Sequence, residues 1–169
     1  YNGHPDTVVI HVKYNIIAKD TGNFMLVFKR NDSLIGASST RFIGVQSNYI
    51  EYRLPVTWIK AGNPDTLVAI ISSSNLDYPK VPGSYLYIDG IQFINSAVPF
   101  PNGDFENWTA ASSEEPDNWF TVNFGKTNVP SVTKSSDSYN GDYAIRIETI
   151  NTLWGKPSGI ITNGKFGDD

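Results

Sequence analysis

The sequence predicts an all-β protein, an antiparallel β-sandwich of the jelly-roll type. Several short segments alternate apolar and polar residues, which is the period of a half-buried strand. Clusters of Gly, Pro, Asn and Asp separate these segments every ~8–12 residues, as in sandwiches and jelly rolls. No segment of helical length shows helical spacing of its apolar residues.

The first half of the chain contains the clearer strands. Val8, Ile10 and Val12 alternate with Val9 and His11, so the first strand is expected here. Further strands are expected, in order, at 24–30, 33–45, 50–56, 66–74 and 85–93. The run 66–74 is almost continuously apolar at its start and predicts a central strand, whereas Pro55 indicates an edge or a bulge.

The second half has weaker strand patterns and more loop residues. Strands are expected, in order, at 104–108, 119–124, 143–150 and 158–164. The polar segments 110–118 and 132–142 are rich in turn-forming residues and predict loops. The two halves do not resemble each other, so an internal duplication is not expected.

Composition limits the classes of protein to consider. The chain has 169 residues, 40% of them hydrophobic and 13% aromatic, which suffices for one domain with a real core. The net charge of −4 argues against a nucleic-acid partner, which usually meets a basic face. No apolar run approaches the ~18 residues of a membrane span, so no membrane insertion is expected. No cysteine is present to form a disulfide, a thiol nucleophile or a metal site.

Several motifs of the second half carry a resemblance to a known family. The motifs NGDFENW, PDNWF, YNGDYAIRIET and GIITNG follow one another between residues 102 and 164. Together they resemble the opening half of a galactose-binding-type jelly roll. Residues 1–95 resemble the closing half of such a domain, and are most similar to carbohydrate-associated surface modules of the Bacteroidota, including the putative carbohydrate-metabolism domain family.

The order of the two halves is reversed relative to this family. The closing half occupies residues 1–95, a linker 96–101, and the opening half 102–169, and together they amount to one domain. The chain is therefore interpreted as a circular permutant, as one period of a tandem array, or as a subunit that exchanges halves with neighbouring copies of itself. Because half a jelly roll leaves strand edges unpaired, we expect the halves to complete one sandwich.

The resemblance implies a structural calcium site. In such domains an acid of the first strand and an acid of the last strand lie side by side, and the matching positions here are Glu106 and Asp89. Asp104, two residues before Glu106, would point to the same side of a strand. Oxygen ligands of this kind suit Ca²⁺. The alternative is that these acids are solvated or paired with Lys or Arg.

Exposed aromatic residues are candidates for stacking against a sugar ring. Trp154 and Tyr78 lie in polar segments, and Tyr49 and Trp58 flank one expected strand. The alternative for each is a place in the core, which is the commoner position for an aromatic side chain in a sandwich. Loss of glycan binding on Trp154→Ala would favour a sugar-binding role.

These observations favour a non-catalytic, extracellular or cell-surface module that binds a glycan or polysaccharide. With only His4 and His11 as histidines and no recognisable acid pair in a cleft, an enzyme is not expected. The alternative function is structural: a repeat or subunit of a surface adhesin or filament that assembles by strand or half-domain complementation and binds no sugar.

Overall fold

The structure is a computed structural model that describes residues 1–75, 80–110, 114–123, 129–153 and 155–163. The described residues form strands, turns and loops without any helix, so none of them makes a helix able to cross a membrane. The strands in chain order are β1 (Thr7–Ile16), β2 (Gly22–Arg30), β3 (Ser33–Phe42), β4 (Gly44–Pro55), β5 (Thr57–Trp58), β6 (Thr66–Ser72), β7 (Tyr85–Ile94), β8 (Trp108–Ala110), β9 (Glu114–Pro116), β10 (Phe120–Thr121), β11 (Val132–Ser135), β12 (Ala144–Glu148) and β13 (Ile160–Asn163).

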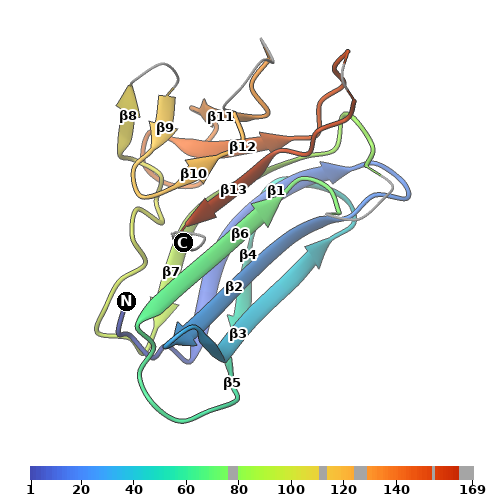
Figure 1. Cartoon of the computed structure of the whole chain (residues 1–169). Helices are drawn as coiled ribbons and strands as arrows, with labels where there is room; N and C mark the ends of the chain where they lie inside the picture. Colours follow the sequence, from blue (N-terminus) through green and yellow to red (C-terminus); the bar gives the residue numbers. More distant parts are fainter. Residues whose placement is uncertain (76–79, 111–113, 124–128, 154, 164–169) are drawn as a thin grey trace.

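Two antiparallel sheets pack face to face, as the sequence predicted. One sheet has the order β11-β12-β7-β1-β4 and the other β10-β13-β6-β2-β3-β5, with β8 and β9 forming a separate two-stranded sheet. Strands from both halves of the chain share each large sheet, since β12 pairs with β7 and β13 pairs with β6. Figure 1 shows the red strand β13 lying along the green strand β6.

The strand pairing is that of a jelly roll read from an internal starting point. The eight strands are counted here in the order β12, β13, β1, β2, β3, β4, β6 and β7. In this order the first pairs with the last, which is β12 with β7, and the second pairs with the seventh, which is β13 with β6. The third pairs with the sixth and the fourth with the fifth, as β1 with β4 and β2 with β3. This nested set of antiparallel pairs describes the double-sheet jelly roll. Residues 1–95 and residues 102–163 therefore contribute strands to one sandwich.

The core lies between the two large sheets and is continuous across both halves. Its largest fully buried side chains, from both halves, are Phe24, Phe28, Phe42, Phe105, Ile10, Leu26, Ile71, Leu86, Ile88, Ile145, Ile147 and Ile161. Phe100, in the expected linker 96–101, is buried between Phe93, with ring centroids 5.2 Å apart, and Trp119, at 5.6 Å. The segment between the halves thus contributes to the shared interior.

The expected strand at 104–108 is wrong for most of its length. Asn102 and Phe105 have positive φ angles of 44° and 50°, which a strand does not allow. The backbone of Gly103 instead accepts a hydrogen bond from Ile91 N at 2.8 Å, with no room for a Cβ atom at Gly103 beside the Ile91 backbone. The chain therefore turns against β7, and strand pairing begins only at Trp108.

Ile147 tests whether the second half belongs to one cooperative core. It is fully buried on β12 and lies opposite Leu86 of β7. We expect Ile147→Ala to lower the free energy of unfolding by about 2–5 kcal/mol, since it leaves a cavity between the halves. Ile43→Ala, at a position 69% exposed, is the control and should change it by less than about 0.5 kcal/mol. Chemical denaturation should show one transition for both variants, and two separate transitions would contradict a single core.

Candidate functional site

The outer face of the five-stranded sheet carries two rows of aromatic and charged side chains. Strand register places Lys13 of β1 opposite Tyr87 of β7, and Tyr87 opposite Arg146 of β12. The adjacent row consists of Asn15, Tyr85 and Glu148 on the same three strands. Because side chains alternate across a sheet, both rows point away from the core residues Leu86 and Ile88.

Cations and tyrosine rings alternate along this face. The Nζ atom of Lys13 lies 4.6 Å from the ring centroid of Tyr87 and 5.0 Å from that of Tyr49. The guanidinium of Arg146 lies 5.8 Å from the ring of Tyr87 and 5.1 Å from that of Tyr85. These distances fall within the range of cation–π attraction, so each ring is held in place by a neighbouring charge.

Each cation also has an acidic partner. Lys13 forms an ion pair with Asp137, and Arg146 forms one with Glu148. Burial lowers the pKa of Arg146, but the hydrogen bond and the charge of Glu148 outweigh it, so the pKa is raised and the guanidinium stays charged. Burial, together with the Asp89 and Asp137 carboxylates, raises the pKa of Tyr49 far above its usual value.

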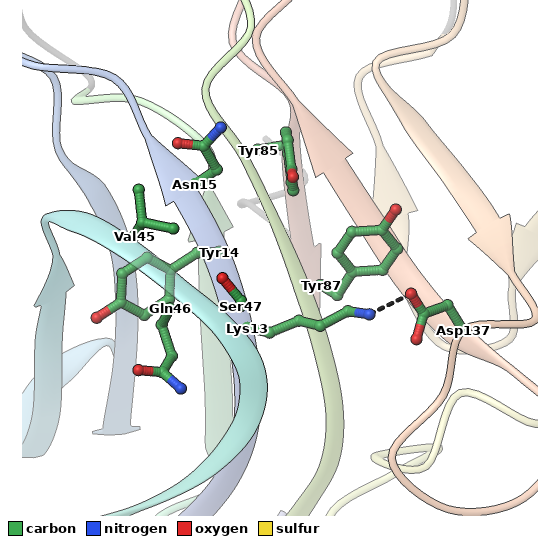
Figure 2. A pocket seen from close by; sticks show the side chains of 9 residues that line it. All are labelled: Lys13, Tyr14, Asn15, Val45, Gln46, Ser47, Tyr85, Tyr87 and Asp137. Carbon is green, nitrogen blue, oxygen red and sulfur yellow. Dashed lines mark hydrogen bonds and ion pairs between the residues drawn. The ribbon is translucent and has the colours of Figure 1, made fainter.

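The β1 and β7 members of these rows line a groove, and Figure 2 shows its lining side chains. Its volume is about 200 Å³, which is below the ~300–1,000 Å³ of pockets for drug-sized molecules. The side chain of Lys13 crosses this face past Tyr87 toward Asp137. The lining residues are Lys13, Tyr14, Asn15, Val45, Gln46, Ser47, Tyr85, Tyr87 and Asp137. The groove can therefore accept a group the size of a single small ring, with polar atoms around an aromatic wall.

Loop 136–143, which joins β11 to β12, is fastened to the sheet by Asp89. The buried Asp89 carboxylate accepts hydrogen bonds from the backbone N–H groups of Tyr139 at 2.8 Å, Asn140 at 3.2 Å and Gly90 at 2.6 Å. Burial raises the pKa of Asp89, and these three N–H groups only partly oppose that effect. The negative charge of Glu106 raises it further.

Glu106 and His11 hold the same loop from two other sides. The Glu106 carboxylate accepts a hydrogen bond from Tyr143 N at 2.9 Å. A Cβ atom at Gly141, where φ is +75°, would collide with this carboxylate, so the turn requires glycine. The ring of His11 stacks on Tyr139 with centroids 3.6 Å apart. Loop 136–143 is thus fixed where it borders the groove.

The predicted calcium ligands are only partly brought together. Asp89 and Glu106 both accept backbone hydrogen bonds from loop 136–143, whereas Asp104 is exposed and lies in a turn instead of on a shared strand face. Loop 136–143 directs backbone N–H groups, not carbonyl oxygens, at both carboxylates. Within the described residues no group of three or more His, Cys, Asp or Glu side chains could hold a metal ion. These donors do not provide the six to eight oxygens that Ca²⁺ takes, and calcium here stays a prediction.

The predicted aromatic residues fall in different places. Tyr49 lies beside the groove, where its hydroxyl donates a hydrogen bond to the backbone oxygen of Asp137 at 2.7 Å. Trp58 lies on the other large sheet, stacked on His4 at 3.6 Å, and its indole N–H donates to Pro5 O at 3.1 Å. The structure therefore does not bring Trp58 and Tyr49 together. Trp154 and Tyr78 lie outside the described residues.

Sequence reasoning missed the residues that form the groove. Tyr85 and Tyr87 lie in the strand expected at 85–93, where they alternate with Leu86 and Ile88 in a way that places both rings on the outer face. That alternation was the available signal. The partners Lys13, Arg146 and Asp137 could not be found in this way, because they come from segments far apart in the chain.

No protein-family model matches this chain, and no curated protein or solved structure is similar enough to it to count as a match. The site therefore has to be interpreted from its own residues.

The two acids next to loop 136–143 lead to a direct test. We expect Glu106→Ala to lower the free energy of unfolding by about 1–2 kcal/mol, because Tyr143 N–H loses its acceptor. Asp104→Ala is the control, and its exposed side chain should contribute less than about 0.5 kcal/mol. Both should be measured by thermal unfolding with calcium and with a chelator. If the Glu106 carboxylate acts only as the acceptor for Tyr143 N–H, the loss is equal in the two conditions. A calcium-dependent stabilisation that Glu106→Ala abolishes would establish the predicted metal site.

Proposed function

We propose that this protein is a non-catalytic carbohydrate-binding module of a secreted or cell-surface protein. The observation that carries the proposal is the groove on the outer face of the five-stranded sheet. It combines two tyrosine rings, Tyr85 and Tyr87, with the polar side chains of Lys13, Asn15 and Asp137. The resemblance to galactose-binding-type domains supports the same function and the extracellular location.

The chemistry of the groove suits a sugar. A sugar ring has an apolar face of C–H groups and a rim of hydroxyls, so it needs aromatic surface and hydrogen-bonding groups side by side. Tyrosine supplies both apolar area and a polar tip. Carboxylates accept hydrogen bonds from hydroxyls, and an amide such as that of Asn15 both donates and accepts.

The groove is also pre-organised for a ligand. Tyr87 is held by Lys13 on one strand and by Arg146 on another, and loop 136–143 is fastened by Asp89. Immobilising flexible side chains on binding costs about 0.5–1.5 kcal/mol each. Because these contacts already fix the ring and the loop, that cost is reduced, and a small groove can bind with useful affinity.

Tyr85 provides the test of this function. We expect Tyr85→Ala to weaken binding to the glycans that the wild-type protein recognises on an array, by about 10- to 150-fold. This range corresponds to the loss of about 1.5–3 kcal/mol for one buried aromatic side chain. Phe120→Ala, an exposed aromatic position on the other large sheet, is the matched control and should bind like wild type. A folded wild-type protein that binds no glycan on a broad array would contradict the proposal.

The second candidate is a structural role in a surface adhesin or filament. Strand β4 has 12 residues and ends its sheet, and no other described strand pairs with its free edge. Ile43 and Val45 are 69% and 67% exposed at the start of this edge. A long edge with exposed apolar residues is a template for pairing with another chain.

This second role predicts self-association that depends on the β4 edge. Sedimentation over a wide range of concentration should then show oligomers of the wild-type protein. Ile43→Lys should reduce them, because a charge at an edge opposes strand addition. If the protein stays monomeric at every concentration and binds glycan, the structural role is contradicted and carbohydrate binding is the one function of the two that is supported.

A further inference from the structure

The charges of the groove are already compensated within the protein. Lys13 is paired with Asp137 and Arg146 with Glu148, so neither cation awaits a negative ligand. Within the first pair the acid is the more accessible partner, since the side chain of Asp137 is 57% exposed and that of Lys13 is 15% exposed. The group that is accessible to a ligand at this pair is therefore the Asp137 carboxylate and not the Lys13 ammonium.

Asp137 is fixed in place as a hydrogen-bond acceptor. Its backbone N–H donates to Ser135 Oγ at 3.0 Å, and its backbone oxygen accepts from Tyr49 at 2.7 Å. Lys13 contacts the Oδ2 atom of its carboxylate. The Oδ1 atom has no hydrogen-bond donor among the described residues, so it remains open to a ligand. An ionised carboxylate only accepts hydrogen bonds, and a group that binds here must donate them.

Asn15 adds a neutral polar group beside Tyr85 in the groove. It lies opposite Tyr85 in the register of β1 and β7. Its side-chain amide forms no hydrogen bond with another described residue, and it can both donate and accept. A sugar hydroxyl satisfies either half of this amide without any requirement for charge.

An acidic ligand would be opposed at this site. To reach Lys13 it would have to displace Asp137 and leave that carboxylate without its cation, and Glu148 adds a second negative charge beside Arg146. Like charges brought close together repel. The whole chain carries a net charge of −4, so the long-range field also disfavours a negative partner.

We infer that the groove selects neutral, hydroxyl-rich glycans over glycans that carry carboxylates or sulfates, with Asp137 as the principal acceptor of their hydroxyls. This inference rests on the proposed carbohydrate-binding function and specifies the ligand class of that same groove.

The experiment measures the affinity of the folded protein for two sets of soluble oligosaccharides. One set consists of neutral hexose and pentose oligomers, and the other of uronic-acid and sulfated oligomers. The variants are Asp137→Asn, which keeps the size of the side chain and removes its charge, and Asp32→Asn as the matched control. Asp32 is exposed in the turn between β2 and β3, on the other large sheet.

We expect the wild-type protein and Asp32→Asn to bind neutral oligomers and to bind acidic ones at least tenfold more weakly. Asp137→Asn should bind neutral oligomers roughly tenfold more weakly, because a hydrogen bond to a charged acceptor is lost. Its preference for neutral over acidic oligomers should also shrink.

Three outcomes would overturn the inference, and they differ in what else they affect. Tighter binding of acidic oligomers by the wild-type protein would refute the neutral ligand class while leaving carbohydrate binding intact. Equal binding by Asp137→Asn and Asp32→Asn would refute the role of Asp137. Binding of neither set by the folded wild-type protein would refute the proposed function and this inference together.

Discussion

The structure depends on one constraint, which is that strands β6 and β7 obtain their second neighbours from the other end of the chain. Without β13 and β12 these central strands would be edges with unpaired backbone groups and an open apolar face. The aromatic contacts among Phe93, Phe100 and Trp119 reinforce this union, because they join both halves and the segment between them. The groove exists only once the union is complete, since it takes Tyr87 from one half and Asp137 from the other.

Alternation along the chain made the fold class and most of the strands predictable. The patterns of β2, β7 and β12 are strong because one face of each strand contacts the core, and β6 was recognisable from its continuous apolar run. Segment 104–108 misled the prediction, because Phe105 is buried through a turn with positive φ and not through a strand. Such a turn is set by contact with Gly103 and Ile91, which local sequence does not reveal.

The site was less predictable than the fold for a physical reason. Asp89 and Glu106 were expected to lie side by side, and the structure places each of them against loop 136–143, where each accepts a hydrogen bond from a backbone N–H group. The hydrogen-bond donors that surround a carboxylate depend on the conformation of the loop that packs against it. The alternation of apolar and polar residues along strands does not indicate that loop conformation. The groove itself is lined from strands β1, β4 and β7 and from loop 136–143, so its parts, such as Lys13 and Asp137, are distant in sequence.

The nested strand pairing has a consequence for how the molecule is made. The pairs β12–β7 and β13–β6 join segments more than 50 residues apart. The chain therefore loses the entropy of closing a long loop before the stabilising contacts of these pairs can form. Topologies of this kind fold slowly. During synthesis on the ribosome, β6 and β7 emerge well before β13 and β12, so one edge of each strand can pair wrongly until those later strands have been translated. The topology thus leaves two strand edges available to other chains for the whole of that interval.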